Sequence, residues 1–187
     1  MILNSYGAGH GIDHDDGSNF WSDTDNVVGF SHACKGNYGS NRNCSGNLIV
    51  GPGLQSMFSH GTETGPCAYE SNNGHGSTFA NKYFEGNTCI QPVAPGSTVP
   101  AYMFQSCNPA AAGGAPELGG TVWATRGNRF WVSANTSVAV PCGHKNIPLE
   151  EWLSRYGQDP GALVEPIPPT VDVLAAARAL LGVPPPA

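Results

Sequence analysis

The sequence predicts an all-β protein that folds as a right-handed, single-stranded parallel β-helix (a solenoid) with a short C-terminal helical cap. Short apolar runs recur at a fixed spacing. Turn-favouring Gly, Pro, Asn and Ser are abundant, whereas charged residues make up only 12% of the 187 residues. We expect the coils to occupy residues 1–147, truncated on the N-terminal side, and a short helix, a Pro-rich linker and a capping helix to occupy residues 148–187.

The repeat is clearest in the first third of the chain. The run NVVGF begins at Asn26 and NLIVG begins 21 residues later at Asn47, and GID and HAC share the same spacing. PCAYESNNG and NKYFEGN continue the pattern after an insertion, with 34 residues from Asn47 to Asn81. Because stacked strands lie about 4.8 Å apart, this repeat predicts His14 beside Lys35.

The segment TVWATRGNRFWVSANTSVAVPC predicts three more short strands, which are centred near Val122, Phe130 and Val138. Strands at this spacing can form the three sides of one coil. The alternative is a set of antiparallel hairpins, because TRGNR also suits a hairpin turn. The repeat spacing favours the coil.

Two helices are expected in the C-terminal region. PLEEWLSRYG, residues 148–157, has Pro at its start, Glu in its first turn and Gly after its end. TVDVLAAARALLG, residues 170–182, is amphipathic, with Thr170 as the expected N-cap and an apolar face containing Val171, Leu174 and Leu181. We expect this second helix to cover the last open coil.

Composition limits the partners and the compartment. A formal net charge of −6, with only eight Lys and Arg, argues against a nucleic-acid partner, and no apolar run is long enough to span a membrane. We expect a monomer with a polysaccharide or glycan partner.

Six cysteines without a CxxC pair favour disulfides over zinc, with Cys34–Cys44 the expected local pair. Sequons begin at Asn43 and Asn135.

These features predict an extracellular or cell-surface protein. The N-terminal stretch MILNSYGAGHG has neither the basic nor the apolar region of a signal peptide. We therefore interpret the chain as a fragment whose signal peptide belongs to a missing N-terminal part.

Four stretches carry a resemblance to a known class of proteins: GIDHDDGSN, HACKGNYGSNRNCSGNLIV, PCAYESNNGHGSTFANKYFEGN and LEEWLSRYGQDPG. The chain resembles the C-terminal part of secreted right-handed parallel β-helix proteins that act on polysaccharides, of the glycoside hydrolase and polysaccharide lyase kind. The similarity covers most of residues 9–161. It implies the fold and a carbohydrate substrate, but not the reaction, because this fold also serves proteins without catalytic activity.

The densest chemistry lies in DHDD, residues 13–16. Neighbouring carboxylates raise one another's pKa, which suits the acid and base of glycosidic cleavage. We therefore predict catalytic roles for Asp13, Asp15 and Asp16, with His14 as a proton carrier. Two alternatives remain open for these residues. They could bind calcium, or they could form a solvent-exposed corner in which the Asp side chains cap backbone N–H groups. We predict no metal site or other cofactor, apart from that possible calcium ion.

A substrate-binding role is predicted for residues near this cluster, either by coil register or as aromatic platforms: His10, His32, Lys35, Asn37, Trp21, Tyr38 and Tyr69. Two functions then remain. The protein either cleaves polysaccharide through its carboxylates, or binds glycan or calcium outside the cell without turnover.

Overall fold

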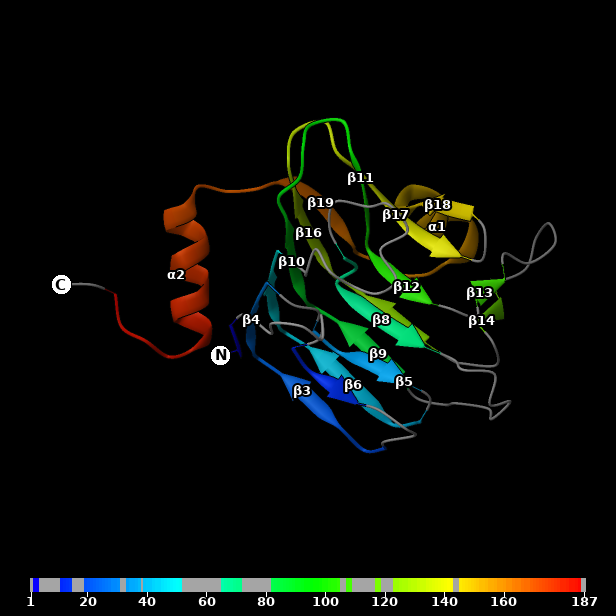
Figure 1. Ribbon diagram of the computed structural model, residues 1–187, viewed down its shortest axis with the longest axis horizontal. Helices are drawn as coiled ribbons and strands as arrows, with labels where there is room; N and C mark the ends of the chain where they lie inside the picture. Colours follow the sequence, from blue (N-terminus) through cyan, green and yellow to red (C-terminus); the bar gives the residue numbers. More distant parts are fainter. Residues whose placement is uncertain are drawn as a thin grey trace.

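In the computed structural model, most of the described strands are stacked in parallel sheets (Figure 1). The described residues are 2–3, 11–14, 19–30, 33–37, 39–51, 65–71, 82–104, 107–108, 117–118, 123–142 and 145–185.

Three sheets form the body of the described structure. Sheet 1 is wholly parallel and contains, in spatial order, β1 (Ile2–Leu3), β4 (Val27–Gly29), β7 (Leu48–Val50), β10 (Thr88–Gln91), β16 (Arg129–Val132) and β19 (Leu163–Pro166). Sheet 3 is also wholly parallel and contains β15 (Trp123–Arg126), β9 (Lys82–Glu85), β6 (Arg42–Ser45) and β3 (Ser22–Thr24).

Sheet 2 is mixed. Its parallel strands are β11 (Thr98–Pro100), β17 (Ser137–Cys142), β12 (Tyr102–Phe104), β8 (Ala68–Ser71), β5 (Lys35–Asn37) and β2 (Asp13–His14). The strand β18 (Lys145–Pro148) pairs with β17 in the antiparallel direction. A separate antiparallel pair joins β13 (Cys107–Asn108) to β14 (Glu117–Leu118). The helices are α1 (Leu149–Tyr156) and α2 (Thr170–Leu180).

The predicted fold class, an all-β right-handed parallel β-helix with a helical cap, is wrong. The described residues form parallel sheets together with a mixed sheet, an antiparallel strand pair and two helices, and they contain no closed solenoid. The physical reason is that a repeat spacing records only which strands stack in parallel. It carries no information about β18, which follows β17 in the chain and pairs with it in the opposite direction.

Some of the expected strand neighbours are nevertheless present. Ser22 pairs with Asn43 and Val27 with Leu48, so the spacing of 21 residues is a real register between parallel strands. In sheet 2, Asp13 pairs with Lys35. His14 is therefore opposite Gly36, one residue from the predicted position.

The later spacing differs from the prediction. Asn47 meets Asn87, 40 residues on, rather than Asn81, because the intervening insertion is longer than the sequence pattern indicated. The hairpin alternative for residues 121–142 is wrong, because β15, β16 and β17 belong to three different sheets.

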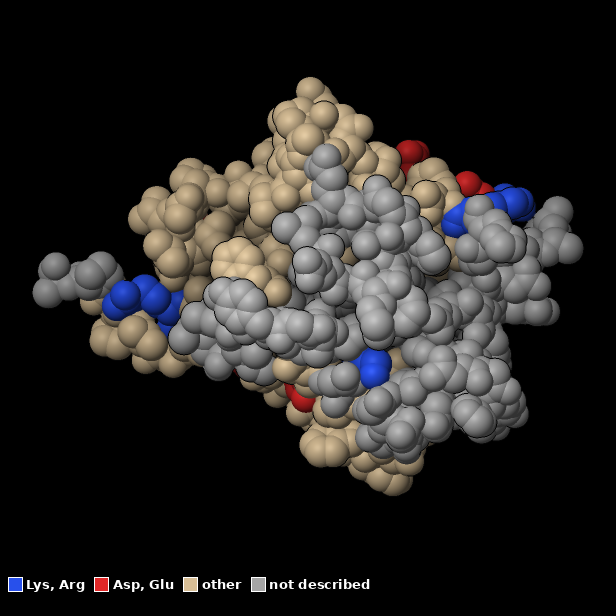
Figure 2. Space-filling view, viewed as in Figure 1, with Lys and Arg blue, Asp and Glu red and all other residues tan. Residues whose placement is uncertain are grey.

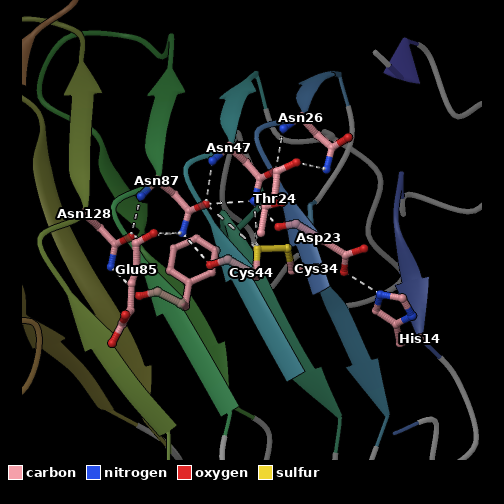
Figure 3. Close-up of a disulfide and its surroundings, with 11 residues drawn as sticks. His14, Asp23, Thr24, Asn26, Cys34, Cys44, Asn47, Glu85, Asn87 and Asn128 are labelled. Atoms are coloured by element: carbon pink, nitrogen blue, oxygen red, sulfur yellow. Dashed lines mark hydrogen bonds and ion pairs between the residues drawn. A yellow bond between two sulfur atoms is a disulfide. The ribbon is translucent and has the colours of Figure 1, made fainter. Parts of the chain in front are cut away.

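A ladder of asparagines marks the corner between sheets 3 and 1 (Figure 3). The backbone N–H of Asn26 donates to Oδ1 of Asn47 at 2.9 Å, that of Asn47 to Oδ1 of Asn87 at 3.0 Å, and that of Asn87 to Oδ1 of Asn128 at 3.0 Å. The N–H of Asn128 donates to Oδ1 of Asp159 at 3.3 Å. We call these five residues the asparagine ladder.

The side-chain amides of the ladder also donate hydrogen bonds to neighbouring strands of sheet 3. Nδ2 of Asn47 donates to the carbonyl of Asp23 at 2.9 Å, and Nδ2 of Asn87 donates to that of Cys44 at 3.0 Å. The residue before each of these asparagines has a left-handed backbone, as at Gly46 with φ of 66°. A Cβ at Gly46 would lie 2.5 Å from Oδ1 of Asp25, so the corner requires glycine there for space as well as for φ.

The core lies between the three sheets and is rich in aromatic contacts. The ring of Tyr102 packs edge-on against Phe84 and Phe130, with centroid distances of 5.2 and 5.7 Å. Trp152 and Tyr156 of α1 join the same buried cluster. Helix α1 confirms the first expected helix, and it ends at Gly157, whose left-handed backbone forms the cap.

Helix α2 confirms the second expected helix, but its predicted details are wrong. Pro169, not Thr170, is its N-cap. The helix packs against sheet 1, not over a last coil, and the contacting residues are Val173, Ala176, Ala177 and Leu180. Val171 and Leu174, expected on the buried face, are 68% and 58% exposed. Because this helix has apolar residues on more than one side, periodicity gives too little contrast to identify its buried face.

Asp159 ends the ladder in a fully buried position. Its Oδ1 accepts hydrogen bonds from Asn128, and the hydroxyl of Tyr102 donates to its Oδ2. Burial raises the pKa of the Asp159 carboxyl above its ordinary value of 3.8, although the bonds from Tyr102 and Asn128 oppose this shift. At a pH between the unfolded-state and folded-state pKa of this carboxyl, folding therefore takes up a proton. The stabilising contribution is fully present below the unfolded-state pKa and is lost as the pH rises through the folded-state pKa.

Asp159→Asn keeps an acceptor oxygen for Asn128 and cannot ionise. We expect the stability of this variant relative to the wild type to increase as the pH rises above about 4, because the wild-type carboxyl then loses its proton. Urea unfolding at a series of pH values measures this difference. Asp172→Asn, at an exposed position of α2, is the control for net charge. Parallel stability profiles for Asp159→Asn and the wild type would show that the buried carboxyl does not titrate differently on folding.

Candidate functional site

The structure describes only part of the predicted site. His10, Asp15, Asp16, His32 and Tyr38 lie outside the described residues. For three more residues it gives a strand position alone, in β2, β5 and β8 respectively: Asp13, Asn37 and Tyr69. The catalytic and binding roles of these eight residues remain predictions.

His14 lies at the centre of the described part of the site. It belongs to β2 in sheet 2, and its Nε2 lies 2.5 Å from Oδ2 of Asp23 on β3 in sheet 3 (Figure 3). The two side chains are only 10% and 16% exposed. Such a carboxylate holds the imidazole in one orientation. We call these residues the His14–Asp23 pair.

Trp21, predicted to bind substrate, lies directly against this pair. Its ring stacks on the ring of His14 with a centroid distance of 4.6 Å and an angle of 28° between the planes. The residue is nevertheless 49% exposed. Trp21 therefore combines a fixed inner contact with a solvent-facing aromatic surface.

A very small cavity of about 10 Å³ adjoins the pair and is also lined by Lys35, Arg42 and Tyr83. Lys35 and Arg42 are both buried, and both have other interactions within the protein. A cavity of this size holds one water molecule at most. Tyr83, which lines this cavity, is 40% exposed.

Disulfides hold the strands around the site. The expected Cys34–Cys44 bond is confirmed and links the residue just before β5 to β6 (Figure 3). Nδ2 of Asn47 lies 3.3 Å from Sγ of Cys44, which connects this disulfide to the asparagine ladder. A second bond joins Cys67 to Cys89, and Cys142 is also disulfide-bonded. This bonding fits an oxidising compartment.

The sequence prediction missed Asp23, Arg42 and Tyr83. None belongs to a compact motif, and Asp23 reaches His14 across two sheets. The register of 21 residues relates strands within one sheet. It gives no distance between strands of different sheets, so no spacing rule connected His14 to Asp23.

The described residues show neither a metal cluster nor a helical membrane span. They include no group of three or more His, Cys, Asp or Glu arranged to hold a metal ion. Calcium binding by residues 13–16 remains a prediction. No helix in the described part of the chain is long and apolar enough to cross a bilayer.

Comparisons of the chain with protein-family models, curated proteins and solved structures found no significant match.

The His14–Asp23 pair leads to a stability prediction. Asp23→Ala leaves a largely buried imidazole without its carboxylate, which should lower the free energy of unfolding by roughly 1–3 kcal/mol. Chemical denaturation monitored by tryptophan fluorescence measures this change. Ser22→Ala, at an exposed position of the same strand, should change it by less than about 0.5 kcal/mol. Equal stabilities of the two variants would mean that the pair does not contribute to folding.

Proposed function

We propose that this protein binds polysaccharide in an oxidising, extracellular environment. The binding surface is formed by Trp21 and Tyr83 over the His14–Asp23 pair. The observation that supports this most directly is the stacking of Trp21, which is 49% exposed, on a histidine fixed by a carboxylate.

Aromatic rings suit sugars because the C–H face of a pyranose packs on the ring face, while the hydroxyls stay hydrated or bond to neighbouring polar groups. A ring that is already fixed loses little rotational freedom when ligand binds. The stacking of Trp21 on His14 provides this preorganisation.

The sparse surface charge also suits a neutral chain of sugars. In the described part of the face seen in Figure 2, Lys, Arg, Asp and Glu are few, and some of the positive and negative groups lie side by side. A long neutral polysaccharide would meet little long-range repulsion on such a surface. This agrees with a total charged content of 12%.

Cleavage of the bound polysaccharide is the second candidate function. It is favoured by the 2.5 Å contact of His14 and Asp23, because an imidazole oriented by a carboxylate can carry a proton in acid–base catalysis. The predicted carboxylates Asp13, Asp15 and Asp16 would supply the second group that hydrolysis needs. We favour binding over cleavage because the cavity beside His14 is too small for a sugar ring.

Substitution of Trp21 tests the binding proposal. We expect Trp21→Ala to weaken binding to the preferred polysaccharide about tenfold, which corresponds to about 1.4 kcal/mol. Affinity electrophoresis against a panel of soluble polysaccharides identifies the ligand, and calorimetry then gives the dissociation constant. Phe30→Ala is the matched control, because Phe30 is also an exposed aromatic residue, at 61%, and is placed just after β4.

Equal affinity of Trp21→Ala and the wild type, or a wild type that binds nothing on the panel, would overturn the proposal. The same incubations are assayed for new reducing ends and for unsaturated products. Products that disappear in His14→Asn would establish the second candidate function.

A further inference from the structure

The two sequons differ sharply in their structural settings. Asn43-Cys44-Ser45 and Asn135-Thr136-Ser137 both end in Ser, so each meets the minimal requirement for N-glycosylation. Any difference between them must therefore come from the middle residue and from the surrounding structure.

Asn135 lies in the turn between β16 and β17, and its side chain is exposed. Its φ of 58° is in the left-handed region, which Asn tolerates better than most residues. Within the described part of the chain, the Asn135 amide has no hydrogen-bond partner. An attached glycan would therefore not disrupt any packing or hydrogen bond described there.

The turn itself is well supported. The N–H of Thr136 donates to the carbonyl of Ser133 at 3.2 Å, and the N–H of Val93 donates to Oγ of Ser133 at 3.0 Å. The segments 92–97 and 133–136 therefore lie side by side, and they project together at the top of Figure 1. Ser137, the third sequon residue, is also exposed, and its hydroxyl shares a hydrogen bond with that of Thr98 at 2.8 Å.

The setting of Asn43 is unfavourable. It lies within β6, which is hydrogen-bonded on one side to β3 and on the other to β9. The middle residue, Cys44, is 4% exposed and is bonded to Cys34. Asn43 itself is partly buried and lines the small cavity beside His14. A glycan there would crowd Tyr83, its neighbour on β9.

We propose that Asn135 is an N-glycosylation site of this protein and that Asn43 remains unmodified. In the reaction, the Asn135 amide nitrogen forms a bond to the anomeric carbon of an oligosaccharide carried on a lipid diphosphate. The bond from that carbon to the diphosphate oxygen breaks, and its electron pair leaves with the lipid diphosphate. The amide gives up one proton. This inference does not depend on the proposed glycan-binding function.

The test uses the full chain, directed into the secretory pathway of a eukaryotic cell by a cleavable signal sequence. We expect a single mobility shift that a peptide-N-glycosidase removes, and mass spectrometry should then find Asp at position 135. Ser137→Ala should abolish the shift and Ser137→Thr, which preserves the sequon, should retain it. Asn43→Gln should also leave the shift unchanged.

Both the medium and the cell lysate are analysed, so that a variant that is poorly secreted still gives a result. A wild-type chain without glycan, a shift that persists in Ser137→Ala, or a shift lost in Asn43→Gln would each overturn the proposal.

Discussion

The structure depends above all on the hydrogen bonds of the asparagine ladder. Four asparagines and Asp159 follow one another along the corner between sheets 3 and 1, and the backbone N–H of each asparagine donates to the side chain of the next rung. Asn47, Asn87 and Asn128 are almost completely buried, so an unpaired amide there would cost roughly 1–3 kcal/mol. A slip of one residue between strands would break several such bonds together, and this makes the register specific.

The same constraint positions the candidate site. Nδ2 of Asn47 bonds to the carbonyl of Asp23 and approaches the sulfur of Cys44. The carboxylate that orients His14 and the disulfide beside it are therefore tied to one rung. Trp21, which stacks on His14, just precedes the strand that carries Asp23. The aromatic surface and its polar support thus depend on the register that the ladder sets.

The predictable features were the local ones. The spacing of 21 residues, both helices and the Cys34–Cys44 bond involve neighbouring segments whose patterns can be compared directly. The Gly-Asn pairs at Gly46, Gly86 and Gly127 were also visible in the sequence and could have identified the partner of Asn47 correctly. The fold class failed, because antiparallel pairing of β18 leaves no repeat signal. The pairing of His14 with Asp23 could not be predicted from the sequence either, because it joins strands of two different sheets.

Amide hydrogen exchange measured by NMR in the Asn87→Ala variant tests the central role of the ladder most directly. The substitution removes the oxygen that accepts the N–H of Asn47 but leaves the acceptor for the N–H of Asn128, Oδ1 of Asp159. We predict that exchange at Asn47 accelerates by a larger factor than exchange at Asn128. Equal changes at both amides, or an unchanged rate at Asn47, would contradict it.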